Sequence, residues 1–504
     1  MTTSESTDSP NCGTHLTRCS AWRQVALLAG PTMGMYLLFM ATETVSLLVL
    51  SRHGSTQELA GLGLGNLVYN CAALAIGFGF TESQDTLVTQ AFGSNRLELC
   101  ELYLHRCQVW MCGVFVLSGP LIGLTEPLLR LLGTCDDETA HHAGIYTRLM
   151  VTGLLGTFQY SALRKFLLAQ KLARPGMWVQ MISLPLHFLW CLLLVPRYGM
   201  KGVGIAMAFK GWTDFFLLGI YASWLAPLPN CRDWWKIWRA FAGERVWPGL
   251  WEYLRLALPC VAMLAVEWWS FELVGLMAGY FHSPDQLAAH VTAANVSAML
   301  YVCGSGAQKA ASALVGGATG RNALYEVKRY FYAALQWNCA IGGLMGLMVC
   351  NGQHPIAVAF VPKSAEVQKI LMSLLPILAV HRVLDGLNQV IQGTLQGFGL
   401  QAKASRVSIF CYWLIMLPAS WACGFPAHLG VPGLWWGCVI SSIVALALNV
   451  RLYRRSNFSE IVAASQLRMQ QDNGEDDDDD DDDDDDGDDD DDRAMPEQNK
   501  TNRI

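Results

Sequence analysis

Charged residues are scarce in this chain of 504 residues, at 15% of the total, against about 25% in ordinary soluble proteins. Hydrophobic residues make up 52%. This balance excludes an ordinary water-soluble domain. Crossing a bilayer core of about 30 Å takes about 20 residues of apolar helix, and the chain contains twelve segments of that length. The composition therefore predicts an integral membrane protein.

Familiar catalytic and metal-binding patterns are also missing. The 16 cysteines include no Cys-x-x-Cys pair and lie mostly in apolar runs, which favours small buried hydrophobes over a disulfide framework or a metal site. There is no His-Glu-x-x-His, no Gly-x-Ser-x-Gly and no phosphate-binding loop for ATP. We therefore expect neither an enzyme nor a cofactor, and no nucleic-acid partner.

The N-terminus carries no hydrophobic signal-peptide core. The first 20 residues are polar, and the first apolar run, 25–50, is too long for such a core and indicates an uncleaved span. The sequence predicts an all-α protein, and its expected spans are 25–50, 60–80, 104–124, 143–169, 177–195, 202–225, 252–281, 287–315, 328–349, 368–394, 404–423 and 431–453.

Negative charge is concentrated at the C-terminus. Asp472, Glu475 and the aspartate runs 476–486 and 488–492 supply 18 negative charges, without which the net charge of −7 becomes +11. Such a block repels itself, so residues 456–504 are predicted to form a disordered acidic tail. The tail either is simply solvated or serves trafficking or a partner, and truncation after Arg468 is expected to leave transport unchanged.

Basic residues predict the orientation, because cytosolic loops carry an excess of Lys and Arg. About 20 basic residues, Arg164 and Lys165 among them, fall in loops on one side of the predicted spans and about 5 on the other. The basic side is therefore expected to be cytosolic, with both termini on it. The membrane is either the plasma membrane or that of an acidic organelle.

The spans divide into two groups of six. After an N-terminal segment, 1–24, an N-lobe at 25–225 and a C-lobe at 250–455 flank a linker, 226–249, whose Trp and basic residues suit an interfacial helix. The stretch Gly199–Val203 opens the sixth span much as Gly430–Leu434 opens the twelfth. Because each lobe has an even number of spans, both lobes have the same orientation in the membrane. A parallel pseudo-two-fold repeat is therefore predicted.

Two carboxylates lie within the seventh span, in Glu267-Trp268-Trp269-Ser270-Phe271-Glu272. A charge at that depth costs about 3 kcal/mol on insertion scales, so a functional role is the default hypothesis. Five residues place the two glutamates about 140° apart around a helix. One is expected to line a cavity and the other to be buried between helices, and the sequence does not say which. The aromatic rings either pack or offer cation–π contacts.

Other intramembrane charges have candidate partners. Arg382 and Asp385, three apart, form either a static or a switchable pair, and Lys210 and Asp214, four apart, are expected to form a structural one. Lys309 either extends to the cytosolic interface or pairs with a carboxylate from another helix. Polar residues that either bind substrate or tie helices together are Asn66, Gln159, Tyr160, Asn295, Asn388 and Gln392.

Short motifs at the ends of several spans resemble a known family. In chain order they are Gln84-Asp85-Thr86, Gln90-Ala91-Phe92-Gly93, Glu267–Glu272, Val315-Gly316-Gly317-Ala318-Thr319-Gly320, Asp385-Gly386-Leu387-Asn388-Gln389 and Gly430-Val431-Pro432-Gly433-Leu434-Trp435. Together, over roughly residues 25–453, they resemble the multidrug and toxic compound extrusion (MATE) family in its eukaryotic form.

That resemblance implies two six-helix lobes around a V-shaped cavity, and efflux of organic solutes driven by H⁺ or, in many bacterial members, by Na⁺. It also assigns function to carboxylates of the seventh and tenth spans. The chain departs from the family pattern in places. Leu47 stands where some prokaryotic members have an aspartate, and Glu43, one turn earlier, is a candidate substitute. Asn295 replaces an eighth-span glutamate, as in plant members.

These features favour a monomeric antiporter that exports organic cations, or other xenobiotic or metabolite solutes, in exchange for H⁺ rather than Na⁺. A buried carboxylate attracts a cation, and protonation releases it. Exporters of organic anions or secondary metabolites, and flippases for lipid-linked solutes, remain open alternatives.

Overall fold

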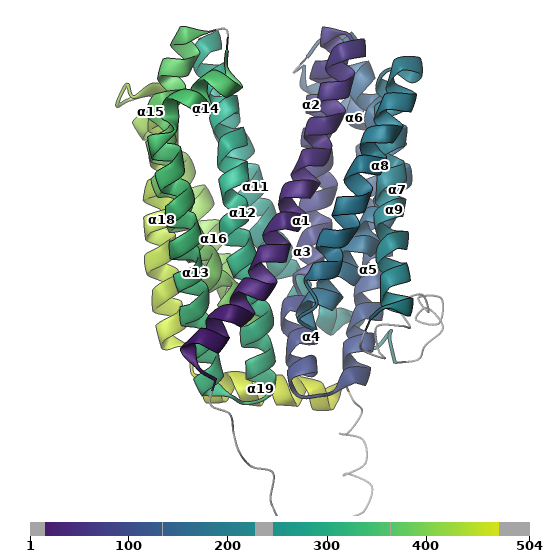
Figure 1. Cartoon of the computed structure of the whole chain (residues 1–504), viewed down its shortest axis with the longest axis vertical. Helices are drawn as coiled ribbons and strands as arrows, with labels where there is room; N and C mark the ends of the chain where they lie inside the picture. Colours follow the sequence, from purple (N-terminus) through teal and green to yellow (C-terminus); the bar gives the residue numbers. More distant parts are fainter. Residues whose placement is uncertain (1–15, 134, 227–244, 363, 473–504) are drawn as a thin grey trace, which may run out of the picture.

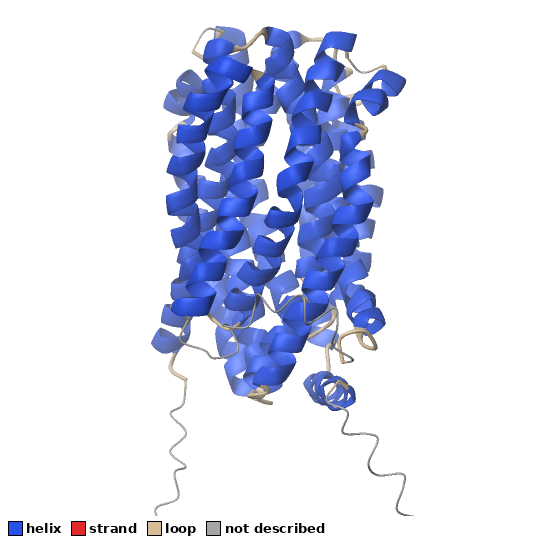
Figure 2. Ribbon diagram, turned by 90° about the vertical axis from the view of Figure 1, so that its right-hand side faces the viewer, coloured by secondary structure: helices blue, strands red, loops and turns tan. Residues whose placement is uncertain are grey.

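The computed structural model describes residues 16–133, 135–226, 245–362 and 364–472, and all regular structure in these ranges is helical (Figure 2). Eleven helical stretches among them are long and apolar enough to cross a membrane. The predicted span 143–169 corresponds to the more polar α7 (Asp137–Ala169), which packs against α2, α5 and α9.

The helices form two bundles (Figure 1). The first bundle contains α1 (Arg18–His53), α2 (Thr56–Tyr69), the π-helical turn η1 (Asn70–Leu74), α3 (Ala75–Thr81), α4 (Gln84–Gly93), α5 (Leu97–Gly123), α6 (Thr125–Leu132), α7, α8 (Arg174–Tyr198) and α9 (Met200–Trp224). The second contains α11 (Leu250–Gly279), α12 (Pro284–Gly320), α13 (Leu324–Asn351), α14 (Gln353–Phe360), α15 (Ala365–Gly397), α16 (Gln401–Ile409), η3 (Phe410–Met416), α17 (Leu417–Gly424) and α18 (Gly430–Arg455).

Backbone geometry repeats between the two bundles. Positive φ angles follow the second and eighth spans at Asn95 (62°) and Asn322 (55°), and open the sixth and twelfth at Gly199 (54°) and Gly430 (63°). Residues with a side chain rarely adopt this conformation, so its recurrence at matching places is informative. The short helices α6 and α14, which the sequence prediction missed, also occupy equivalent connections. These matches support the predicted parallel repeat.

The bundles meet closely at one end, here called the α19 end, and diverge toward the other (Figure 1). At the α19 end α4 contacts α12, where glycines allow backbone contact: a Cβ on Gly93 would overlap the Gly317 carbonyl oxygen. The amide of Gln90 donates to the Gly397 carbonyl at 2.9 Å, and Ser312 Oγ donates to the Asp85 carbonyl at 3.3 Å. The first bundle is thus fastened to the second there.

The helix α19 (Phe458–Gln471) lies across this end (Figure 1). It buries Ile461, Val462 and Met469, and Ser465 Oγ donates to Gln90 Oε1 at 2.8 Å. The predicted disordered tail is therefore wrong for this segment, because an amphipathic helix finds an apolar and polar surface to cover. Residues 473–504 lie outside the described residues.

Two further predicted boundaries remain to be compared with the structure. The first helix begins at Arg18, so it includes the end of the predicted N-terminal segment 1–24. Most of the predicted linker 226–249, at 227–244, lies outside the described residues, so the expected interfacial helix stays a prediction. The lobe boundaries likewise stay predictions.

Candidate functional site

An ion pair lies deep in the second bundle. Arg382 Nη1 donates to Asp385 Oδ2 at 2.9 Å on α15, and Gln389 Nε2 donates to the same oxygen at 2.7 Å. Arg382 Nε donates to Ser297 Oγ of α12 at 2.7 Å. Asp385 is 3% exposed. The pair expected from the three-residue spacing is therefore present, and hydrogen bonds from two helices hold it in place.

Glu267 joins this pair from α11. Its side chain is buried, interacts electrostatically with Asp385 and Arg382, and hydrogen-bonds with Tyr301 of α12. The Arg382 guanidinium lies over two rings, 5.4 Å from the centroid of Phe271 and 5.4 Å from that of Tyr301. The group holds two carboxyls and one fixed cation. When both carboxyls are ionised, one negative charge is left uncompensated in a buried, aromatic-lined site.

Glu272 lies in a different environment from Glu267. It is exposed, on the side of α11 that also carries Trp269, whose Nε1 donates to the Cys71 carbonyl of the first bundle at 3.2 Å. Trp268 is half-buried and meets Phe78 of α3 edge to face at 6.3 Å. The helix thus presents Glu267 to the second bundle and the two tryptophans to the first, while Glu272 stays exposed.

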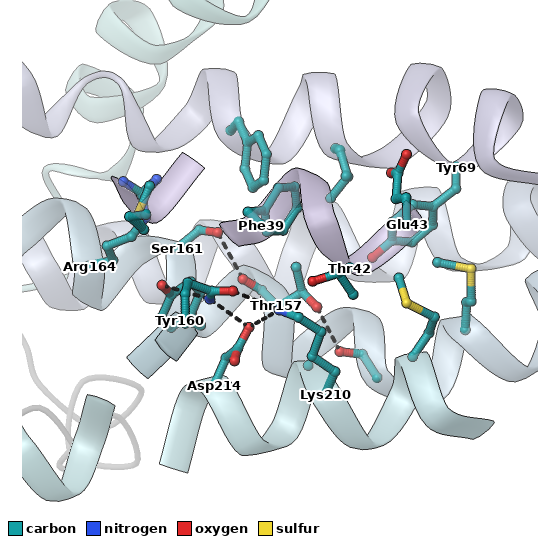
Figure 3. Close-up of a pocket in the computed structure, with 18 of the residues that line it drawn as sticks. Phe39, Thr42, Glu43, Tyr69, Thr157, Tyr160, Ser161, Arg164, Lys210 and Asp214 are labelled. Carbon is teal, nitrogen blue, oxygen red and sulfur yellow. Dashed lines mark hydrogen bonds and ion pairs between the residues drawn. The ribbon is translucent and has the colours of Figure 1, made fainter. Parts of the chain in front are cut away.

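A pocket lies within the first bundle (Figure 3). Glu43 lines it from α1 and Tyr160 from α7. Its wall includes a buried pair on α9, in which Lys210 Nζ lies 2.6 Å from Asp214 Oδ2. Gln180 of α8 bonds both members, at 3.0 Å each, and donates to Tyr160 Oη at 3.1 Å. The expected Lys210–Asp214 pair is present, with a third helix tied to it.

Four charges cluster where the bundles meet at the α19 end. Lys165 Nζ of α7 lies 3.0 Å from Glu82 Oε1 and 2.7 Å from Asp85 Oδ2. Lys309 of α12 pairs with Glu82 and lies 3.6 Å from Asp85 Oδ2. All four are buried. Lys309 was expected either to extend to the interface or to pair with a carboxylate from another helix. The structure shows the second arrangement.

Arg164 and Lys165 were counted as loop residues for the orientation, although the predicted span 143–169 contains them. In the structure both lie inside α7, a turn before its end at Ala169, and are 8% and 1% exposed. Arg164 lines the pocket of the first bundle. Positive charge near a span end predicted a loop, whereas buried carboxylates and aromatic rings hold these residues within the helix.

The remaining candidates are spread over the molecule. Asn66 accepts from Tyr146 Oη at 2.7 Å, and Gln159 donates to the Gln108 carbonyl at 3.1 Å. Asn388 accepts from Asn449 Nδ2 at 2.6 Å, whereas Asn295 is exposed. The first three therefore link neighbouring helices, and none of the four contacts the Glu267 group in a described hydrogen bond.

Among the described residues, eleven apolar helical stretches in two repeated bundles define the class as a multi-pass membrane protein, and both bundles hold buried charges. The family model described as MatE matches residues 31–193 and 259–422, most of both bundles. The chain belongs to the MatE family. It is therefore a transporter of the multidrug and toxic compound extrusion class, not an enzyme, and a multi-pass membrane protein.

Relatives and solved structures agree with this assignment. Protein DETOXIFICATION 37 of Arabidopsis thaliana is 25% identical over 449 residues, covering 88% of this chain and 87% of that protein. Protein DETOXIFICATION 31 of the same plant is 26% identical over 458 residues, covering 89% and 84%. The crystal structure of the eukaryotic MATE transporter AtDTX14 has a similar fold, with a TM-score of 0.82 at 21% identity, covering 90% and 99%.

Proposed function

We propose that this transporter exports organic cations in exchange for protons, and that Glu267 and Asp385 carry the exchange. The observation that supports this is the charge balance of the buried group: two carboxyls face one guanidinium. A lone negative charge is costly in a low-dielectric site. Either a proton or a cationic substrate can neutralise this charge. Binding of one therefore lowers the affinity of the group for the other. That competition is the minimum requirement for antiport.

The surroundings of the group suit a cationic ligand. Tyr301 and Phe271 present rings beside Arg382, and ring faces attract cations by about 0.5–2 kcal/mol. Arg382 cannot lose its proton at physiological pH, so it keeps one carboxylate ionised throughout the cycle. The account therefore predicts one proton exchanged for each monovalent cation.

The orientation follows from the basic residues. The α19 end carries Arg96, Arg321 and Arg406 near its span ends, and the positive-inside rule places such an end in the cytosol. The closed contact between α4 and α12 then faces the cytosol, and the diverging ends face outward. A proton gradient directed into the cytosol, across the plasma membrane or from an acidic organelle, would drive export. Nothing in the proposal requires more than one copy of the chain.

The test is transport of a fluorescent organic cation in proteoliposomes, with H⁺ and Na⁺ gradients imposed separately. We expect the proton gradient to drive uptake and the sodium gradient not to. Glu267→Gln should lower proton-driven transport at least tenfold. Glu272→Gln is the matched control, one acid on the same helix but outside the buried group, and should lose less.

Two results would contradict the proposal. One is Na⁺-driven transport that is unaffected by pH. The other is a Glu267→Gln variant that transports normally. A substrate panel with organic anions and lipid-linked sugars tests the alternatives, since strong proton-driven movement of an anion alone would replace the cation as the substrate class.

A further inference from the structure

The start of α1 lies beside α13 at the α19 end (Figure 1), and a groove with a volume of about 480 Å³ lies between them. It is here called the α13 groove, and its volume is typical of small-molecule sites. The α13 residues that line it follow the three-and-four spacing of one helix face. Its polar and charged lining residues are Arg18 of α1 and Tyr325, Lys328, Arg329, Tyr332 and Gln336 of α13. No lining residue is shared with the pocket of the first bundle.

Three cations line the α13 groove, and no carboxylate does. They are Arg18, Lys328 and Arg329. Within the described ranges, no acidic side chain forms an ion pair with any of the three. Glu326, the one acidic residue of α13, is bound by Arg321 at 2.6 Å instead. Like charges gathered in one groove repel one another, so the groove favours a ligand that brings several negative charges.

Both helices that bound the groove begin at this end. The first residue of α1 is Arg18 and that of α13 is Leu324, and a helix N-terminus carries a partial positive charge from its aligned peptide dipoles. The first turn of α1 contains no acidic residue to offset that charge. Arg329 is oriented by Tyr325, whose hydroxyl accepts from Nε at 2.9 Å and from Nη2 at 2.5 Å. A planar guanidinium held in this way suits a phosphate group.

The surroundings of the groove indicate a lipid as the source of the phosphate. Beyond Gln336 the same face of α13 continues into the membrane-spanning stretch with Ala340 and Leu347, which are exposed. Such residues contact acyl chains in a bilayer, whose tails are as apolar as Leu. On α1, Trp22 is 41% exposed and its ring centroid lies 5.2 Å from that of Trp337. Tryptophans gather at the level of the lipid headgroups, so the groove lies at that level.

We propose that the α13 groove binds the headgroup of a phosphoinositide, a lipid that carries a phosphodiester and at least one phosphomonoester. At neutral pH the monoester carries about 1.5 to 2 negative charges, and the diester adds one, so together they match the three cations. Anionic lipids concentrate in the cytosolic leaflet, which agrees with the orientation proposed above. Because α1 belongs to the first bundle and α13 to the second, the bound headgroup joins the two bundles.

The test measures binding, so its outcome is independent of the exchange proposed at Glu267. The probe is dioctanoyl phosphatidylinositol 4-phosphate, titrated calorimetrically into the full chain in an uncharged detergent. Dioctanoyl phosphatidylserine, which has the same chains and one net negative charge, should bind at least tenfold more weakly. Glycerophosphoinositol 4-phosphate, which has the same headgroup without the chains, should also bind at least tenfold more weakly. Glu267→Gln should bind the probe as the unaltered chain does.

Variants locate the site. Lys328→Gln combined with Arg329→Gln should lower the affinity for the probe at least tenfold, since each basic residue contributes about fivefold to binding an anionic lipid. The matched control is Lys403→Gln combined with Arg406→Gln, which removes two exposed charges of α16 at the same end but outside the groove. Its affinity should stay within twofold of the unaltered chain. Arg18→Gln should lose about fivefold, which tests the contribution of α1 separately.

Four results would overturn the proposal. Equal affinity for the phosphatidylserine probe would show that any anionic lipid suffices, and equal affinity for the headgroup without chains would assign the groove to a soluble phosphate. An equal loss in the α16 control would show a diffuse attraction to the whole basic end. The acidic residues 473–504 are the alternative occupant, and a chain cut after Asp472 that binds the probe at least tenfold more tightly would assign the groove to them.

Discussion

Arg382 has a double role at the residue scale. It holds Asp385 ionised through a hydrogen bond of 2.9 Å, and its second donor reaches Ser297 at 2.7 Å. Breaking a buried ion pair by removing one partner leaves an uncompensated charge and costs about 3–5 kcal/mol. The same side chain therefore stabilises the second bundle and sets the charge of the proposed exchange group.

The buried Arg382–Asp385 pair predicts a specific pattern of stabilities. Arg382→Gln should destabilise the protein, because it leaves Asp385 buried without a cation. The double variant Arg382→Gln with Asp385→Asn should recover much of the loss, because neither charge remains. Thermal unfolding of the purified protein in detergent measures both. A double variant no more stable than Arg382→Gln alone would show that the pair does not act as a unit.

The two seventh-span glutamates show what residue spacing predicts and what it leaves open. Helix geometry required them to face different ways, and in the structure Glu267 is buried while Glu272 is exposed. Which of the two glutamates is buried depends on Tyr301 and Arg382, which come from other helices. The sequence gives no distance between spans, so it could not select the inward residue.

At the element scale, helix α19 covers the end of the molecule where the two bundles meet. Asp472, just after it, lies 2.5 Å from Arg106 of α5 and accepts from Tyr103 Oη at 2.7 Å, and Arg96 donates to the Met469 carbonyl at 3.0 Å. A hydrogen bond to a charged group contributes about 1.5–3 kcal/mol. The last turn of α19 is therefore anchored to the first bundle.

Truncation before these anchoring contacts and truncation just after them should have different effects on transport per molecule. The sequence alone suggested that removing everything after Arg468 would be harmless, whereas the structure predicts that this cut frees α19 and lowers transport per molecule. A cut after Asp472 is the matched control and should leave transport unchanged. Vesicle transport normalised to protein amount measures both, and equal activity of the two truncations would remove the anchor from the account.

The four-charge cluster also acts between elements, because Lys309 of α12 binds acids of the first bundle. Lys309→Gln should weaken the contact between α4 and α12 and speed hydrogen exchange of backbone amides in α4. Lys210→Gln removes an equally buried lysine whose partners all lie in the first bundle. Hydrogen exchange of the α4 amides should therefore stay unchanged in that variant. Equal exchange in the two variants would count against a fastening role.

Over the whole molecule, the sequence predicted the spans well and their contacts poorly. Apolar runs define where helices lie: each predicted span coincides with a helical stretch to within a few residues, and eleven of these stretches are apolar enough to cross a membrane. The positions of Arg164 and Lys165, and the partner of Lys309, depend on residues far away in the chain. Periodicity within one span carries no information on such pairs. Helix α19 was missed because its burial depends on a surface built by both bundles.

The central claim of the account is that one buried group holds either a proton or a cationic substrate. The most direct measurement is proton release on cation binding, followed with a pH indicator in weakly buffered detergent solution. The account predicts about one proton released per monovalent cation bound, and none from Glu267→Gln. Cation binding without proton release, or equal release from that variant, would contradict it.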